Sequence, residues 1–131
     1  MQIVEPIDIE DVLRTDFSEI VPEIAFHSTP APNDIGSCSV CFTALGGGEA
    51  TAVSHEYDVS VDVWGSTPGK AMSLARRIQG VMTSLPMRSL ASARDYKTAS
   101  ATLPYNNPDP NRPTIPRCTF SATVGLRGNR I

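Results

Sequence analysis

The sequence predicts an α+β domain: an antiparallel-rich sheet of four to five strands with two amphipathic helices packed on one face. Three observations support this class. Residues 55–64 alternate apolar and polar side chains, the pattern of a half-buried strand. Residues 71–85 repeat apolar side chains at helical spacing. Residues 37–45 and 117–126 also alternate, and their polar positions are mostly Ser and Thr, as expected for a sheet with one solvated face.

Length and composition indicate one domain spanning residues 1–131. The chain is 40% hydrophobic and 19% charged, which is ordinary for a globular domain with one core. The net charge of −3 gives no general attraction to nucleic acid, and no apolar run approaches the roughly 20 residues that cross a bilayer. The first residues are acidic, unlike a secretory signal, and three cysteines do not form a disulfide framework. We therefore expect synthesis in a reducing cytoplasm and no membrane partner.

The strand and helix at the centre of the chain meet at a tight turn. Gly65 ends the strand pattern, Ser66 or Thr67 can accept from the first free amides of the helix, and Pro68 suits its first turn. Pro86 ends the helix. A strand that turns directly into an amphipathic helix places that helix over its own sheet.

Another helix is predicted before this unit, over residues 8–20. Asp8 can cap it, and acidic side chains crowd its first turn, where the helix dipole favours negative charge. Pro22 ends it, and residues 23–28 alternate weakly enough for a short strand. Residues 29–36 form a loop rich in turn residues.

A long hairpin is predicted around the glycine run. The strand at residues 37–45 and the strand at residues 55–64 are joined by residues 46–54, which begin with three glycines. We expect this segment to be a flexible hairpin loop whose tip projects.

The last third of the chain is less regular. Residues 96–103 alternate faintly and predict a strand. Residues 104–116 hold five prolines and three asparagines, and form a proline-rich arm because they cannot form a helix or a central strand. Residues 117–126 are the last clear strand, and residues 127–131 are expected to be a tail.

Neither a metal site nor a catalytic constellation is expected. Cys38 and Cys41 form a CxxC, but zinc needs four ligands, and Cys118, His27 and His55 stand at no recognised spacing. A redox CxxC belongs at a helix start, whereas this one lies in a strand pattern. The glycine run lacks the Gly-Lys-Ser/Thr of a phosphate loop. We expect no enzymatic activity and no cofactor.

Carboxylates form a row on one strand face. Glu56, Asp58 and Asp62 share a face because side chains two apart point the same way. The simplest interpretation is a solvated sheet face, and a metal site or acid–base pair would need further ligands or a histidine. If the protein forms a ring, the same row would give the channel an acidic wall.

Several positions are candidates for contact with other chains. Trp64 either caps the sheet edge or anchors an interface, and Arg76 and Arg77 are either the solvated side of the helix or pair across a subunit boundary. The full candidate set is Gly46, Gly47, Gly48, Glu49, Trp64, Arg76, Arg77, Tyr105, Asp109 and Arg112.

Together these patterns resemble the tail terminator, or tail-completion, proteins of long-tailed siphophages. The likeness covers about residues 8–127. It rests on YDVSVDVWGSTPGKAMSLARRIQGVMTSLP at residues 57–86, on NPDPNRP at residues 107–113, and on the alternating last strand in RPTIPRCTFSATVGLRG.

The resemblance implies a small α+β domain that assembles as a homohexameric ring. Such a ring caps the finished tail tube, ends its polymerisation and meets the head connector, so the implied location is the head-proximal end of the tail in the virion. The implied partners are further copies of the chain, the tail tube protein and head–tail connector proteins. DNA would pass through the lumen without specific binding, along a wall of Glu56, Asp58 and Asp62. Residues 46–54 and 104–116 would contact neighbouring subunits or the tube.

Other functions stay open at this point. The chain could be another neck or tail-tube component, or a tail assembly chaperone or other cytosolic adaptor. A small ligand-binding α+β domain or enzyme is the remaining class, and it would need a concave pocket with converging polar groups.

Overall fold

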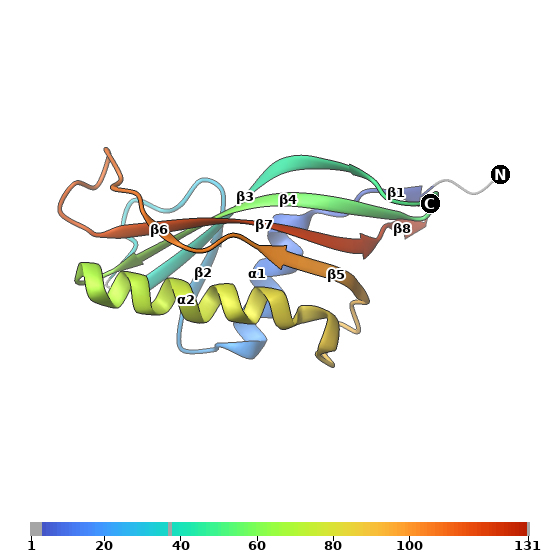
Figure 1. Ribbon diagram of the computed structural model, residues 1–131, viewed down its shortest axis with the longest axis horizontal. Coiled ribbons are helices and arrows are strands. Elements are labelled where there is room, and N and C mark those ends of the chain that lie inside the picture. The colour runs from blue at the N-terminus through green and yellow to red at the C-terminus, as the bar shows by residue number, and fades with distance from the viewer. Residues whose placement is uncertain (1–3, 37, 131) are drawn as a thin grey trace.

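A six-stranded sheet forms the body of the molecule, and both helices pack on one of its faces (Figure 1). The computed structural model describes residues 4–36 and 38–130. The strand order is β2-β3-β4-β7-β5, and β6 pairs with β7 as well. The bounds are β2 Ala25–Ser28, β3 Cys38–Glu49, β4 Ser54–Gly65, β5 Tyr96–Ala101, β6 Tyr105–Asn106 and β7 Arg117–Arg127, with α1 Ile9–Ile20 and α2 Pro68–Ser84. The predicted α+β class is confirmed, with one strand more than expected.

The sheet is antiparallel except at one edge. The β2 strand runs parallel to β3, whereas every other pair is antiparallel. A separate two-stranded sheet joins β1, Val4–Glu5, to β8, Asn129–Arg130. The expectation of a tail at residues 127–131 is therefore corrected: Arg127 ends β7, residues 129–130 pair with the start of the described chain, and residue 131 lies outside the described residues.

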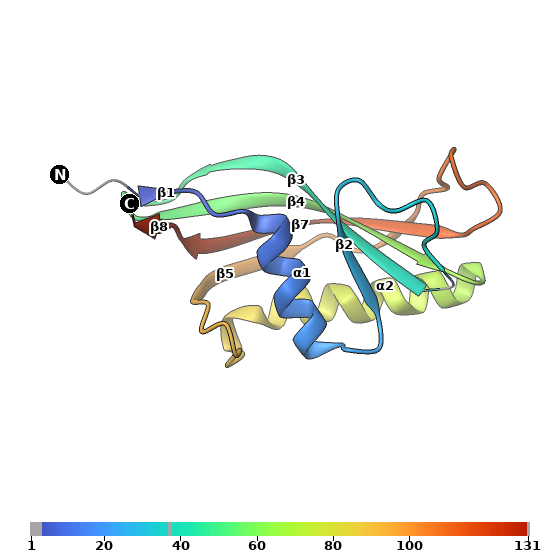
Figure 2. The same ribbon diagram turned by 180° about the vertical axis from the view of Figure 1, so that it is seen from behind.

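The first helix begins and ends where the sequence predicts. The Asp8 side chain accepts a hydrogen bond of 3.3 Å from the Asp11 amide and so caps α1. The α1 helix contacts β2 and β3, and the view from behind shows it next to β2 (Figure 2). Phe17 of α1 packs with Phe26 of β2 and Phe42 of β3, with ring centroids 5.0–5.9 Å apart.

The second helix follows β4 through the predicted turn. Thr67, rather than Ser66, caps α2 by accepting from the Lys70 amide at 3.1 Å, and Pro68 is the first helical residue. A side chain at Gly65 would meet the Ala71 amide nitrogen at 2.6 Å, so this glycine lets the helix approach its own strand. A 3₁₀ turn, η1 Leu85–Met87, follows α2 and contains Pro86. None of the described helices is long and apolar enough to cross a membrane.

The core lies between the helices and the inward side of the sheet. Val59, Val61 and Val63 of β4 are fully buried on the helix-covered face of the sheet, and Phe120 and Val124 of β7 continue the same layer. The outward positions of β4 and β7 carry the polar side chains, as the period of two predicts.

The prediction of a long hairpin is confirmed, but the predicted bounds of its loop are wrong. The three glycines lie inside β3, which runs to Glu49 and carries a bulge between Ala44 and Gly46. Residues 50–53 alone make the turn, where the Thr51 hydroxyl accepts from the amides of Val53 and Ser54. Gly46 and Gly47 have φ values of 105° and 136°, which a glycine adopts readily, so the run bends a strand instead of forming a loop. In Figures 1 and 2 β3 arches away from β4 along this stretch.

Candidate interaction surfaces

The predicted carboxylate row lies on the solvated face of the sheet, held by threonines of the neighbouring strand. Thr123 donates a hydrogen bond of 2.8 Å to Asp58, and Thr119 donates one of 2.7 Å to Asp62. Glu56 lies opposite Gly125 and is exposed. In the described part of the chain, no group of three or more His, Cys, Asp or Glu side chains could hold a metal ion. The row is thus a surface of carboxylates and hydroxyls.

Trp64 is covered by its own chain, which favours the first of its two interpretations, a cap on the sheet, over an interface anchor. Its side chain is only 2% exposed and packs with Ile35 and Cys41 in a small second cluster on the outer side of the sheet. The Arg112 guanidinium carbon lies 5.5 Å from the centre of the indole ring, a cation–π contact. Trp64 therefore holds the arm against the sheet and offers almost no surface to a neighbour.

Asp109 and Arg112 bind to each other within the chain, and their contact with a neighbouring subunit stays a prediction. Arg112 donates to Asp109 at 2.9 Å and to the Pro32 carbonyl at 2.7 Å. Burial acts to raise the pKa of Asp109, but the hydrogen bond from Arg112 and the charge of Arg117 outweigh it and lower the pKa. The proline-rich arm is therefore folded back and tied to the sheet, although its loop still projects at the end of the molecule opposite the termini (Figure 1).

Arg76, Arg77 and Tyr105 remain on the surface. Arg77 pairs with Glu23 at 2.8 Å, and because both side chains are about half exposed this ion pair adds little stability. Tyr105 is 53% exposed, and Leu103, two residues before it, is 79% exposed. Leu103 and Tyr105 lie at the β5–β6 edge of the sheet, next to α2.

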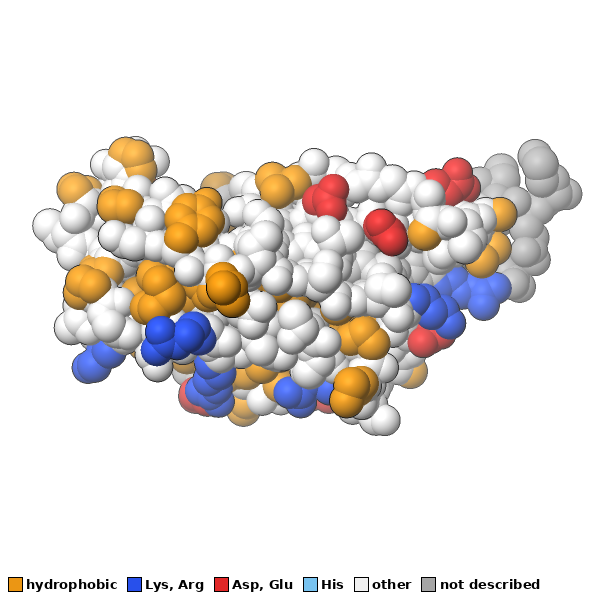
Figure 3. All heavy atoms as spheres, viewed as in Figure 1, with side chains coloured by type: hydrophobic (Ala, Val, Ile, Leu, Met, Phe, Trp, Pro, Cys, Tyr) orange, Lys and Arg blue, Asp and Glu red, His pale blue; other side chains and the backbone are white. Residues whose placement is uncertain are grey.

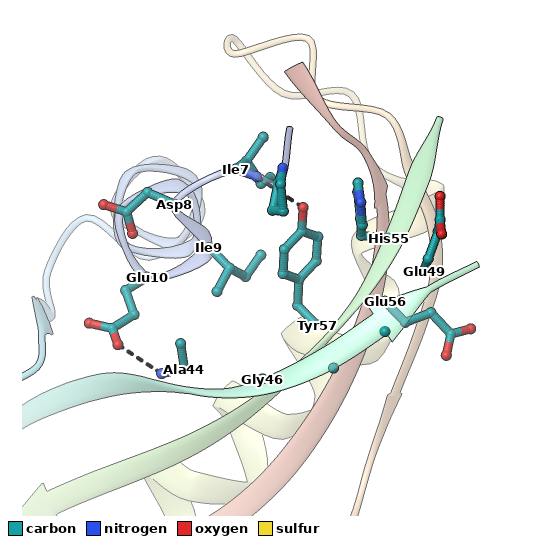
Figure 4. A pocket seen from close by; sticks show the side chains of 13 residues that line it. Ile7, Asp8, Ile9, Glu10, Ala44, Gly46, Glu49, His55, Glu56 and Tyr57 are labelled. Atoms are coloured by element: carbon teal, nitrogen blue, oxygen red, sulfur yellow. Dashed lines mark hydrogen bonds between the residues drawn. The ribbon is translucent and has the colours of Figure 1, made fainter. Parts of the chain in front are cut away.

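A groove that the sequence did not reveal lies along the distal half of the β3–β4 hairpin. This hairpin groove has a volume of about 450 Å³ and runs between the hairpin and the segment that leads into α1 (Figure 4). Its lining comes from three separate stretches: Pro6, Ile7, Asp8, Ile9 and Glu10; Ala44, Gly46, Gly47, Gly48 and Glu49; His55, Glu56 and Tyr57.

Two hydrogen bonds hold the walls of the hairpin groove. The Ile7 amide donates to the Tyr57 hydroxyl at 3.0 Å, and the Ala44 amide donates to the Glu10 carboxylate at 2.8 Å (Figure 4). The second oxygen of Glu10 accepts from the Thr29 amide at 2.8 Å. The walls are mainly apolar, whereas Asp8, Glu10 and Glu49 make the rim acidic. Only the glycine run hinted at this groove, because a stretch without side chains leaves room beside a strand.

The backbone beside the hairpin groove is an open sheet edge. The β2 strand pairs with β3 only over residues 39–42, so within the described residues the β3 edge from residue 43 to residue 49 has no strand neighbour on that side. The opposite edge, β5, is open in the same sense. Open edges of this kind can accept a further strand from another chain.

The cysteines do not assemble into a site. Cys38 is exposed, whereas Cys41 and Cys118 are buried, and all three are free thiols. Burial raises the pKa of the Cys41 and Cys118 thiols, which favours the unreactive protonated form. Cys38 and Cys41 therefore do not form a redox-active pair in this structure, despite their CxxC spacing.

Comparison with protein-family models gives no match, and a search of curated proteins gives no significant match either. The surfaces described above are therefore interpreted from their own chemistry.

Proposed function

We propose that this chain is a structural protein of a phage virion that assembles as a ring, caps the tail tube, ends its polymerisation and joins it to the head connector. The observation that carries the proposal is the sheet itself. It combines one carboxylate- and hydroxyl-covered face with an open edge on each side. The sequence resemblance to tail terminator proteins agrees with this role.

The open edges suit ring formation. A closed ring needs head-to-tail contacts between two different patches of each subunit. The β3 edge and the β5 edge lie at opposite ends of the strand order, so one copy can present each to a different neighbour. Hexamer formation is the expectation that follows from the resemblance.

The solvated face suits the lumen of such a ring. Glu56, Asp58 and Asp62 would face passing DNA, and like charge keeps phosphates from binding. Lys or Arg at these places would instead gain affinity by releasing counterions. Under this proposal DNA moves along the wall without specific contacts.

The first test is the mass of the purified protein, alone and with tail tubes, by light scattering and negative-stain microscopy. We expect six-fold rings, free or capping one end of a tube. A persistent monomer that ignores tubes would contradict the proposal. It would favour another component of the phage neck, or a tail assembly chaperone that is absent from the finished particle.

The lumen assignment has its own test. Asp58→Lys/Asp62→Lys should leave the ring intact but make it retain double-stranded DNA at low salt and release it at high salt. The matched control, Asp58→Asn/Asp62→Asn, removes the same charges without adding cations and should not retain DNA. Equal behaviour of the two variants would place these residues outside the lumen.

One feature favours a second function. The hairpin groove is large enough for a small ligand, and its walls are mostly apolar, which is typical of ligand sites. A ligand-binding domain would work as a monomer and would lose function when the groove is filled, whereas a ring protein would lose assembly.

A further inference from the structure

We propose that the hairpin groove receives the 103–105 segment of a second copy of this chain, so that copies join head to tail. The inference rests on the proposed function in one respect only, namely that the partner is another copy of the chain. Beyond the proposed function, it identifies the two surfaces that meet, namely the hairpin groove and the 103–105 segment.

The 103–105 segment is an exposed apolar patch. Leu103 is 79% exposed and Tyr105 is 53% exposed, and they follow β5 at the open side of the sheet. Figure 3 shows hydrophobic side chains along the boundary between the sheet and α2, with Lys and Arg side chains just below them. Two large apolar side chains so close together on an edge indicate a contact site.

The groove and the segment lie on opposite edges of one sheet. The groove is formed by β3 and β4 with the α1 entry, whereas residues 103–105 lie beyond β7 on the β5 side. The two cannot meet within one chain. A contact between them must join two copies, and in the ring proposed above it repeats head to tail, because each copy gives its groove to one neighbour and its 103–105 segment to the other.

Charge is divided between the same two sides. Residues 5–23, which include α1 and one wall of the groove, carry seven acidic side chains and one basic one, Arg14. Residues 63–94, which include α2, carry five basic side chains and no acidic one. Packing the α2 side of one copy against the α1 side of the next therefore brings opposite charges together.

Arg76 connects this charge to the apolar segment. It lies on α2, which contacts β6, and β6 begins at Tyr105. The side chain of Gln79, one turn further along α2, donates to the Ala101 carbonyl at 3.5 Å. The Arg76 side of α2 thus lies beside residues 103–105, and it would meet the acidic rim of the groove at Glu49.

The decisive experiment mixes two assembly-deficient variants. Leu103→Glu places a charge in the apolar 103–105 segment but leaves the groove intact. Ala44→Trp fills the groove but leaves the segment intact. Each alone should be monomeric by light scattering, with self-association weakened at least tenfold. An equimolar mixture should give a dimer and nothing larger, because only one productive contact exists. Met87→Gln is the matched control, since Met87 is 89% exposed, lies outside residues 103–105 and gains no negative charge by this substitution, and it should assemble like the wild type.

Two further measurements complete the test. Glu49→Lys is a second groove variant at an exposed position, and it should weaken self-association as Ala44→Trp does. Raising the salt from 0.1 to 1 M shortens the screening length from about 10 to 3 Å and should weaken self-association of the wild type severalfold.

The outcomes separate this inference from the proposed function. Wild-type protein that stays monomeric at all concentrations, single variants that still assemble, or a mixture that stays monomeric would each overturn the groove contact. If the mixture forms the dimer but the wild type does not bind tail tubes, the contact between groove and segment is supported and the capping role is refuted. If the wild type caps tubes and both variants do so equally well, the capping role stands and the contact fails.

Discussion

The hydroxyl of Tyr96, at the start of β5, donates a hydrogen bond of 2.6 Å to the carboxylate of Asp16 in α1. Both side chains are buried, at 4% and 1% exposure. Burial and the neighbouring Asp16 carboxylate raise the pKa of the Tyr96 hydroxyl, so it stays a donor throughout the physiological range. This bond ties the acidic helix to the strand at the far edge of the sheet.

Removing that donor should be costly. Tyr96→Phe leaves a buried carboxylate without its partner, and we expect the free energy of unfolding to fall by about 1–3 kcal/mol. Urea denaturation at neutral pH measures the loss. Tyr105→Phe is the matched control, because the Tyr105 side chain is exposed, and it should unfold like the wild type. Equal stability of the two variants would show that Asp16 finds another donor.

Gly47 should not tolerate a side chain. A Cβ there would lie 2.0 Å from the Glu56 carbonyl oxygen, and φ is 136°. Gly47→Ala should therefore destabilise the hairpin, by about 1–3 kcal/mol from the strained backbone alone. Gly48→Ala meets nothing within 4 Å and should be nearly neutral. Thermal denaturation of both variants, with amide exchange of residues 43–60, would locate the effect, and a neutral Gly47→Ala would refute the strand bend.

The cap of α2 gives a smaller, local effect. Thr67→Ala removes the oxygen that accepts from the Lys70 amide, so we expect a loss of about 1 kcal/mol. For a chain of this length that corresponds to a decrease in Tm of about 3–5 °C. Ser66→Ala should leave the Tm unchanged, and the reverse ranking would assign the cap to Ser66.

Asp109 should make the free energy of unfolding depend on pH in the acidic range. Its pKa is lower in the folded chain than the usual value near 3.9, so its stabilising effect is complete above about pH 4 and is lost as pH falls through the folded pKa. Asp109→Asn should cost about 1–3 kcal/mol at pH 7, and its difference from the wild type should shrink as the pH falls through the folded pKa of Asp109.

Urea denaturation across pH 2–7 tests this dependence. Asp95→Asn removes a carboxylate from an exposed ion pair with Lys97 and should keep the wild-type stability at neutral pH. If the difference between wild type and Asp109→Asn were constant with pH, the ionised carboxylate would not be what stabilises the arm.

Much of the fold could be predicted because its main elements have strong periods and clear ends. The alternation at residues 55–64 corresponds to β4, and that at residues 117–126 to β7, each within two residues of the observed bounds. Asp8 and Pro68 marked the helix starts correctly. The glycine run was misinterpreted because glycine is common in loops, and only the positive φ values of a bulged strand explain it here. The two-residue strands β1, β6 and β8 are too short to show any period.

The surfaces were harder to predict because they depend on contacts between distant residues. By its position in the alternation of residues 55–64, Trp64 belongs to the polar face of the sheet, where it is found. Whether it is exposed there depends on Arg112, which lies over it from the arm. The hairpin groove needs three segments at once, and no local pattern contains it. By contrast, the carboxylate row followed from a single strand and was found on the expected face.

The unequal burial of the three thiols makes the protein a natural substrate for site-selective labelling. A maleimide dye or spin label should attach to Cys38 alone under native conditions, since Cys41 and Cys118 are shielded and held protonated. Each copy would then carry one reporter at the start of β3. Energy transfer between reporters on neighbouring copies could follow assembly as it happens, without altering a single residue.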